Sequence, residues 1–244
     1  MKKILLFLFP VLLVVACSDE QDYSLDDYYI DIATVENPDN STAFYLKLDD
    51  DTRLWTAATE LKYYRPIDGQ RVIANFSILS DKEAGSAYDH DIKLNDVYEV
   101  LTKDIFKITP ATQDSIGNDY IYIRDIWIGS DYLNVRFEFP GGNQMHFINL
   151  VTDSLKTYSD GKIHLEFRHN SNGDYPYLNL TGIVSFNLKS LKTNDADQID
   201  IVVHTREFNE PVNGIYNLTY KYGSNSSAEI KRKVSVPEYK ALVE

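Results

Sequence analysis

The stretch Tyr132-Leu133-Asn134-Val135-Arg136-Phe137-Glu138-Phe139 decides the fold class of this chain. Its polar and apolar residues alternate, and a period of two is typical of a β-strand with one face buried and the other in water. Residues 162–168 repeat the pattern, with Ile163, Leu165 and Phe167 on the apolar face. The sequence therefore predicts β-strands at both places.

Similar runs, rich in β-branched and aromatic residues, occupy most of the chain. Segments such as Asp68-Gly69 and Asn172-Gly173-Asp174 separate them with turn-forming residues. Strands joined by short turns, without long helical patterns between them, favour antiparallel sheets, so we expect an all-β protein. The further expected strands are residues 28–35, 42–48, 71–79, 96–102, 120–128, 145–151, 178–188, 199–205 and 215–222.

A segment without any period, residues 109–119, contains several turn-forming residues and marks a domain boundary. Residues 28–108 before it have the size of a small closed or partly open barrel such as an OB fold. Residues 119–238 after it have the size of an antiparallel β-sandwich. We therefore expect an OB-like barrel followed by a β-sandwich.

The N-terminus has the layout of a secretory signal, with Lys2 and Lys3 before an apolar run and small residues before Cys17. The apolar run is about a dozen residues, whereas a membrane-spanning helix needs roughly 20. The pattern resembles a bacterial lipoprotein signal, in which the thiol receives a diacylglycerol before cleavage. Residues 1–16 are thus expected to be removed and Cys17 to carry the lipid that attaches the protein to the membrane.

Residues 17–27 form a polar, acidic tether in this prediction. The residues Ser18-Asp19-Glu20 also resemble the signal that sends some Gram-negative lipoproteins to the outer cell face, and a plain spacer explains them equally well. The expected location is the outer membrane, with exposure at the cell surface left open.

Charge and cysteine content exclude several functions. The formal net charge is −13, which repels phosphate backbones, so we expect no nucleic-acid partner. Cys17 is the single cysteine, and its lipidation would leave no thiol for a disulfide, a nucleophile or a metal site.

The chain resembles the NigD-like lipoproteins. The resemblance rests on Cys17 with its acidic continuation, on Gly69-Gln70-Arg71-Val72 at the entry to a barrel strand, and on the run 120–128 that opens the second domain. It implies an N-terminal OB domain, a C-terminal β-sandwich and no catalytic residue to carry over. It also implies a role associated with secretion operons of the bacteriocin type.

No catalytic or metal-binding motif stands out. A Gly-x-Ser-x-Gly motif is absent, and the five histidines lack the spacing of a metal site, so we expect them on solvated strand faces and predict no metal and no cofactor. The calcium candidates Asp49-Asp50-Asp51 and the set Asp195, Asp197 and Asp200 match no twelve-residue calcium loop, which favours solvated turns. The histidines are His90, His146, His164, His169 and His204.

Aromatic residues near turns are the candidates for ligand stacking. Tyr175-Pro176-Tyr177 follows a turn and is stiffened by proline, which favours exposure. Tyr63, Tyr64 and Trp55 are further candidates, whereas Trp127 lies in a dense strand and is expected in the core. Two tripeptides resemble acceptor sites for O-glycosylation, and their hydroxyl residues are Ser115 and Ser154.

These observations predict a lipid-anchored, non-enzymatic binding or accessory protein of the cell envelope. Its partner is expected to be a protein of an envelope or bacteriocin-type secretion system. A surface glycan held by stacked tyrosines is the alternative, and a hydrolase with an unrecognised pair of carboxylates is the second alternative.

Overall fold

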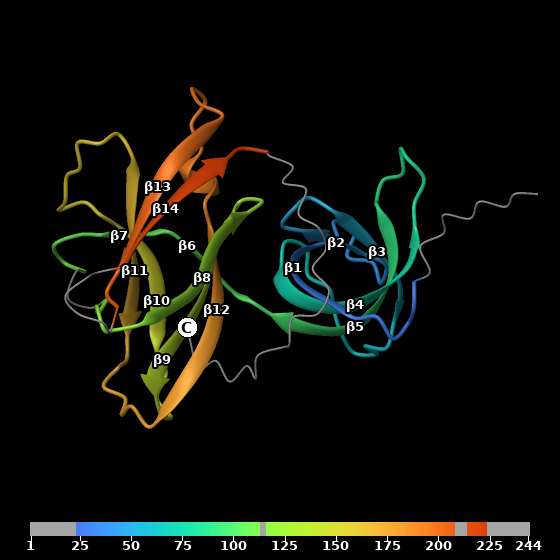
Figure 1. Ribbon diagram of the computed structural model, residues 1–244, viewed down its shortest axis with the longest axis horizontal. Coiled ribbons are helices and arrows are strands. Elements are labelled where there is room, and N and C mark those ends of the chain that lie inside the picture. Colours follow the sequence, from blue (N-terminus) through green and yellow to red (C-terminus); the bar gives the residue numbers. More distant parts are fainter. Residues whose placement is uncertain (1–22, 113–115, 208–213, 224–244) are drawn as a thin grey trace, which may run out of the picture.

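The computed structural model describes residues 23–112, 116–207 and 214–223, which build two β-domains (Figure 1). The barrel lies at the right of the figure and the sandwich at the left. Within the described residues, the regular elements are strands apart from one short 3-10 turn, Lys189–Leu191. The all-β prediction is therefore confirmed. The predicted signal, Cys17, Ser115 and residues 224–238 lie outside the described residues.

The first domain is a closed barrel with the strand order β1-β2-β3-β5-β4, as expected of an OB-like domain. Alternating residues of β4 such as Val72, Ala74 and Phe76 are fully buried inside it. Phe76 also stacks on Tyr29 with the ring centroids 5.7 Å apart. The barrel strands are β1 (Tyr29–Glu36), β2 (Tyr45–Leu48), β3 (Arg53–Thr59), β4 (Arg71–Asp81) and β5 (His90–Glu99).

The end of the predicted tether packs against this barrel. The Tyr23 hydroxyl donates to Asp81 Oδ1 at 2.6 Å, and the Ser77 hydroxyl donates to the Leu25 carbonyl at 3.2 Å. The barrel therefore holds the chain from Tyr23 onward, five residues earlier than Tyr28, where the sequence predicts the first strand.

The second domain is a sandwich of a five-stranded sheet, β14-β13-β11-β10-β7, and a four-stranded sheet, β6-β12-β9-β8. Its strands are β6 (Leu101–Asp104), β7 (Phe106–Ile108), β8 (Tyr122–Gly129), β9 (Tyr132–Gly141), β10 (Phe147–Asp153), β11 (Ile163–Asn170), β12 (Leu178–Asn187), β13 (Gln198–Thr205) and β14 (Gly214–Lys221). Hairpins such as β8–β9 and β13–β14 pair antiparallel as expected. The pairs β6–β12, β7–β10 and β11–β13 are parallel, so both sheets are mixed, and the expectation of purely antiparallel sheets is wrong.

Two short strands, β6 and β7, also move the domain boundary. The sequence assigns residues 101–108 to the barrel, but β6 pairs with β12 and β7 pairs with β10 of the sandwich. The barrel thus ends near Val100, and that part of the domain prediction is wrong. Strands of four and three residues are too short for their alternation to show which sheet they join.

The sandwich core follows the pattern of the stretch that predicts it. Leu133, Val135, Phe137 and Phe139 are all fully buried between the sheets. Complete burial of such a side chain contributes roughly 1.5–3 kcal/mol. Gly182 on β12 lies opposite, where a β-carbon would approach the Phe137 ring to 2.6 Å, so only glycine accommodates this ring.

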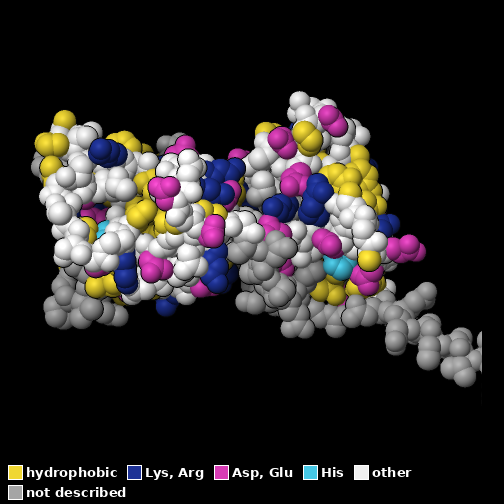
Figure 2. All heavy atoms as spheres, turned by 90° about the horizontal axis from the view of Figure 1, so that it is seen from above, with side chains coloured by type: hydrophobic (Ala, Val, Ile, Leu, Met, Phe, Trp, Pro, Cys, Tyr) yellow, Lys and Arg dark blue, Asp and Glu magenta, His cyan; other side chains and the backbone are white. Residues whose placement is uncertain are grey.

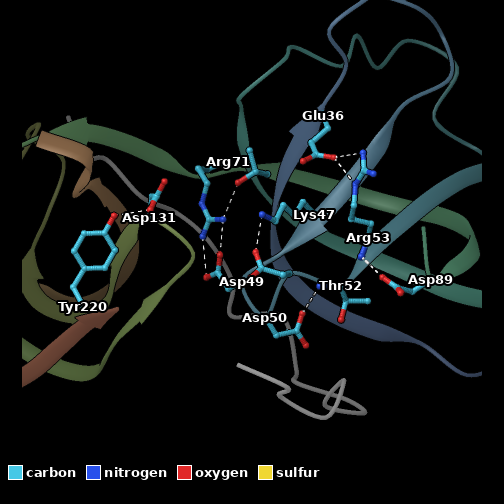
Figure 3. A network of polar contacts seen from close by, with 12 residues as sticks. Glu36, Lys47, Asp49, Asp50, Thr52, Arg53, Arg71, Asp89, Asp131 and Tyr220 are labelled. Carbon is cyan, nitrogen blue, oxygen red and sulfur yellow. Dashed lines mark hydrogen bonds and ion pairs between the residues drawn. The ribbon is translucent and has the colours of Figure 1, made fainter. Parts of the chain in front are cut away.

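A buried polar cluster joins the two domains, and Figure 3 shows its barrel side, Arg71 with Asp49. The Arg71 guanidinium is fully buried and donates to both Asp49 carboxylate oxygens, at 2.7 and 3.0 Å. It also donates to Thr34 at 3.1 Å and, across the junction, to Asn134 Oδ1 at 3.0 Å. Asn134 Nδ2 donates back to Asp49 at 2.8 Å. The sequence pattern places Asn134 on the solvent-facing side of its strand, but the barrel packs over this side and buries it.

Apolar residues surround this cluster. Ile32, Ile73 and Val100 pack against Ile183 of the sandwich, with Trp127 at their edge. Trp127 is therefore half-buried at the domain junction, and not inside either domain core. The junction combines ion pairing, hydrogen bonds and apolar contact, so the barrel and the sandwich are held in a fixed relation.

Candidate binding surfaces

The barrel displays an aromatic face, which we define as Tyr45, Trp55 and Tyr88 with the cations Arg53 and Lys82. Tyr45 and Trp55 are cross-strand neighbours on β2 and β3, with ring centroids 4.8 Å apart. Tyr88 comes from the β4–β5 loop and lies 5.6 Å from Tyr45 and 6.0 Å from Trp55. All three rings are half-buried, so each presents part of its surface to solvent.

Cations lie over the rings of the aromatic face, and carboxylates hold these cations. The Arg53 guanidinium is 4.8 Å from the Tyr45 centroid and pairs with Glu36 at 2.7 Å (Figure 3). The Lys82 ammonium is 5.3 Å from the Tyr88 centroid and pairs with Asp91. Burial alone would raise the pKa of Asp91, but the hydrogen bonds from Lys82 and Ser80 lower it. The face is thus rigid and locally balanced in charge.

The position of the aromatic face within the barrel is informative. OB folds bind ligands on the surface of their second and third strands and in the β4–β5 loop, and these elements carry the three rings. Tyrosine, tryptophan and arginine are also the residues enriched in the centres of protein interfaces. The surface is therefore suited to bind another molecule by stacking and apolar contact. Figure 2 shows hydrophobic side chains beside charges of both signs on the barrel, at the right.

Sequence reasoning named only Trp55 of this face. It overlooked β3, because residues 53–59 follow an acidic turn and end in exposed residues. Alternation across the hairpin was the available signal, since it places Tyr45 and Trp55 on one face.

The candidates Tyr63 and Tyr64 face in different directions. Tyr63 is 89% exposed and has no ring partner in the described part of the chain. Tyr64 packs on Phe44 at 5.8 Å, and burial raises the pKa of its hydroxyl to about 12. The structure thus assigns Tyr64 to packing and leaves Tyr63 as an isolated exposed ring, and the two do not form a joint stacking site.

Tyr175 and Tyr177 lie at one end of the sandwich, in the turn between β11 and β12. They are 69% and 78% exposed, and their ring centroids are 6.0 Å apart. Asp174 fixes the turn, because its carboxylate accepts from the backbone N–H of Gly142 and of Tyr175. The pair is available to a ligand at this end of the sandwich, and stacking on it stays a prediction.

Two buried histidines lie beneath this turn, which contradicts the expectation of solvated histidines. His169 Nδ1 donates to the Tyr120 carbonyl at 2.9 Å, since a carbonyl can only accept. Burial, reinforced by the charge of His146, lowers the pKa of His169 to about 4, so His169 is neutral and its Nε2 accepts from His146 Nδ1 at 2.7 Å. His146 Nε2 faces Asp174 at 3.0 Å.

This chain of hydrogen bonds ends on the Asp174 carboxylate. Burial alone would raise the pKa of Asp174, but hydrogen bonds from His146 and from backbone N–H groups lower it to about 2, so the group is a carboxylate. His146 and the Asp174 carboxylate thus form a buried hydrogen-bonded pair. The pair connects the tyrosine-bearing turn to the sandwich core and gives it a structural role.

The remaining predicted sites are occupied by structural contacts. Asp49 of the calcium candidates lies in the β2–β3 turn but is bonded to Arg71, so it is not solvated as expected. Asp200 accepts from Thr219 at 2.9 Å. The Ser154 hydroxyl, a candidate for O-glycosylation, donates a hydrogen bond to the Ile108 carbonyl at 2.7 Å. Among the described residues, no group of three or more His, Cys, Asp or Glu side chains is placed to hold a metal ion.

These features define a two-domain all-β protein in which an OB barrel with an aromatic face is fixed to a β-sandwich. Family models match both domains: the NigD-like N-terminal OB domain matches residues 32–100, and the NigD-like C-terminal β-sandwich domain matches residues 104–227. The chain belongs to the NigD-like family.

Solved structures support this assignment. A protein of unknown function from Bacteroides vulgatus is 32% identical with a TM-score of 0.70, over 82% of this chain and 92% of its own. A protein from Parabacteroides distasonis described as toxin-related is 38% identical with a TM-score of 0.67, over 81% and 95%. A NigD-like immunity protein from Bacteroides caccae is 18% identical with a TM-score of 0.62, over 79% and 96%, and shows the shared fold. None of the curated proteins compared with the chain matches it.

Proposed function

We propose that this protein is a lipid-anchored, non-enzymatic protein of the cell envelope that binds a protein partner through the aromatic face of its barrel. The partner belongs to an envelope or bacteriocin-type secretion system. Membership of the NigD-like family and the relative described as toxin-related support this assignment. The composition of the aromatic face carries the proposal.

The aromatic face has the properties of an interface centre. Its three rings are large and held in place, so little conformational entropy is lost when a partner covers them. Arg53 and Lys82 are already paired with carboxylates, so the face does not act mainly as a site for anions. Residues of this kind dominate binding in protein interfaces, where truncation of one costs about 2 kcal/mol or more.

The predicted anchor would place this face close to the membrane. Tyr23 is bonded to Asp81, at the end of β4, and Lys82 next to it lies over Tyr88 of the aromatic face. Six residue steps separate Cys17 from Tyr23, which span roughly 20 Å when fully extended. A lipid on Cys17 would therefore keep the aromatic face within reach of a partner in or on the same membrane. No helix in the described ranges is long and apolar enough to cross a membrane.

Site-specific photocross-linking in the native host tests the partner site. A photoreactive amino acid at Tyr88 should yield one discrete adduct that disappears when Trp55→Ala is added. The same amino acid at Tyr63, an exposed ring on the same barrel, is the matched control and should not yield that adduct. Equal adducts at both positions, or an adduct at Tyr88 that survives Trp55→Ala, would contradict the proposal.

The anchor has its own test. Cys17→Ala should move the protein from the membrane fraction to the soluble fraction and abolish labelling with a fatty-acid analogue. A second acylated chain is what makes such attachment stable, so loss of the thiol should have a large effect. Unchanged membrane retention would rule out lipidation at Cys17.

The exposed tyrosine pair at the sandwich end supports a glycan as the second candidate ligand. Tyr175 and Tyr177 are held on a proline-containing turn that Asp174 fixes, and sugar rings stack on such aromatic surfaces. A glycan array probed with the soluble form starting at Ser18 should then show binding that Tyr177→Ala removes. Tyr63→Ala is the control for an exposed tyrosine elsewhere. Absence of array signal, together with a protein adduct at Tyr88, favours the protein partner.

A further inference from the structure

The sandwich has a hollow on the outer face of its five-stranded sheet that none of the surfaces above uses. On β11, Leu165 and Phe167 face the core, so the intervening Glu166 and its neighbours on alternate positions face outward. The loop after β10 folds over this outer face, and Tyr158 stacks on His164 with the centroids 3.5 Å apart. The hollow encloses about 270 Å³. Its lining includes the side chains of Lys156, Tyr158, Glu166, Arg168, His204 and Arg206, together with the polar residues Asn118 and Thr205.

Positive charge exceeds negative charge in this hollow. Three cations line it, and Glu166, which is only 7% exposed and pairs with both Lys156 and Arg168, is the one carboxylate in the lining. Outside the lining, Asp153 lies 3.5 Å from Lys156. Arg206 donates to the Asn118 carbonyl at 3.0 Å and to the Tyr120 hydroxyl at 2.8 Å, and the nearby Asp119 carboxylate accepts from Ser171. In a chain with a net charge of −13, a hollow of this sign stands out as a site for an anionic group.

The arginines of the hollow are arranged before any ligand arrives. The Arg206 guanidinium lies 4.0 Å from the Tyr120 ring centroid, and Arg168 Nε donates to Glu166 at 2.7 Å. Both guanidinium groups are thereby oriented, and their planar donor pairs match the two oxygens of a carboxylate or a phosphate. Binding of an anion in the hollow therefore costs little conformational entropy in these two arginine side chains.

A histidine pair adds a hydrogen-bond acceptor to the hollow. In its neutral tautomer His164 donates from Nε2 to Asp160, 3.0 Å from both carboxylate oxygens, and its Nδ1 then accepts from His204 Nε2 at 2.9 Å. Burial lowers the pKa of His204 and keeps its ring neutral. The remaining nitrogen, His204 Nδ1, therefore carries a lone pair, and it has no partner among the described residues.

We propose that this hollow binds a small carboxylate ligand that carries an N–H or O–H donor beside its carboxylate. The carboxylate lies against Arg168, Arg206 and Lys156, and the neighbouring donor bonds to His204 Nδ1. The volume suits a single residue or sugar unit, because drug-sized sites begin at about 300 Å³. The terminal residue of a peptide and a uronic acid share this chemistry.

Calorimetric titration of the purified protein tests the site. The probes are N-acetylalanine and glucuronic acid, which both have the acid and the donor. Their methyl esters lack the charge, and acetate lacks the donor. We expect at least one of the two acids to bind about tenfold more tightly than acetate, and the esters not to bind. If one of the two acids binds and the other does not, the acid that binds shows whether the natural ligand is a peptide terminus or a sugar acid.

Variants locate the binding. Arg206→Gln and His204→Phe should each weaken binding of the acid about tenfold or more, and phenylalanine keeps a flat ring against Tyr158. Lys62→Gln, an exposed cation of the barrel, is the matched control and should leave binding unchanged. Thermal unfolding of each variant confirms that it is folded. Equal binding of acetate and the acids, unchanged binding in both hollow variants, or no binding at millimolar probe would overturn the proposal.

Discussion

Strand β11 carries two histidines on opposite faces, and each pairs with a histidine of a neighbouring strand or turn. His169 and His146 lie on the core side, where both are fully or almost fully buried. His164 and His204 lie on the outer side, covered in part by Tyr158. Each pair ends on an aspartate, Asp174 in the first and Asp160 in the second. The order of the groups is the same in both pairs, but the direction of the hydrogen bond between the rings and the surroundings differ.

The difference shows how burial assigns roles. In the core pair, every ring nitrogen has a partner, so the pair fixes the turn with Tyr175 and Tyr177 and offers nothing to a ligand. In the outer pair, His204 Nδ1 remains free within the described part of the chain and faces a hollow. One strand thus supports a structural pair on one face and a binding element on the other.

Truncation of the core pair should have the largest effect. His146→Ala removes a buried ring that lies 4.5 Å from the Phe139 centroid and leaves the nitrogen of His169 without its donor. We expect a loss of about 3 kcal/mol in the free energy of unfolding, measured by urea denaturation. His164→Ala in the outer pair is the matched control, with an expected loss of about 1 kcal/mol. Equal losses would remove the distinction between the pairs.

Acid should weaken the fold through the same core pair. The pKa of His169 is about 4 in the folded protein and 6.5 ordinarily, so the unfolded chain binds the extra proton first. Stability is therefore full above about pH 6.5 and falls as the pH drops towards 4, by about 3 kcal/mol in total. Urea midpoints measured across this range should show the fall. His169→Gln should flatten the profile, and a flat wild-type profile would contradict the assignment.

The smallest effect is expected at the exposed end of the outer pair. The hydrogen bond from His164 lowers the pKa of Asp160 and keeps this carboxylate charged, and it fixes which nitrogen of His164 carries hydrogen. Asp160→Asn should leave the unfolding midpoint unchanged but mix the tautomers of His164 and His204. Nitrogen NMR of the ring resonances measures this mixing. A single retained tautomer would show that Asp160 does not orient the pair.

Much of this arrangement follows from the sequence, and the rest depends on contacts between distant segments. The odd spacing of His164 and His169 places them on opposite faces, as their positions on β11 confirm. Their burial was not visible, because it requires His146 from another turn and Tyr158 from a loop that folds back. Alternation likewise places Asn134 on the wet face of its strand, and only the barrel that packs there reveals why it is buried.

The aromatic face was only partly predictable for a similar reason. Tyr45 and Trp55 are neighbours because a tight turn at Asp50 pairs their strands, which a reading of residues 45–55 as one hairpin could have shown. Tyr88 joins them from a loop more than thirty residues further along the chain, and no local pattern indicates that contact. Local periodicity gives strands and faces, whereas a site assembled from several loops needs the tertiary structure.

The buried link between Arg71, Asp49 and Asn134 limits how this protein can be dissected. A barrel produced alone would leave the guanidinium without Asn134 and would expose Ile32 and Ile73 to water. A sandwich produced alone would lose the carboxylate that Asn134 donates to. We therefore expect deletion of either domain to yield insoluble fragments, so that genetic assignment of roles to each half requires point substitutions in the intact chain.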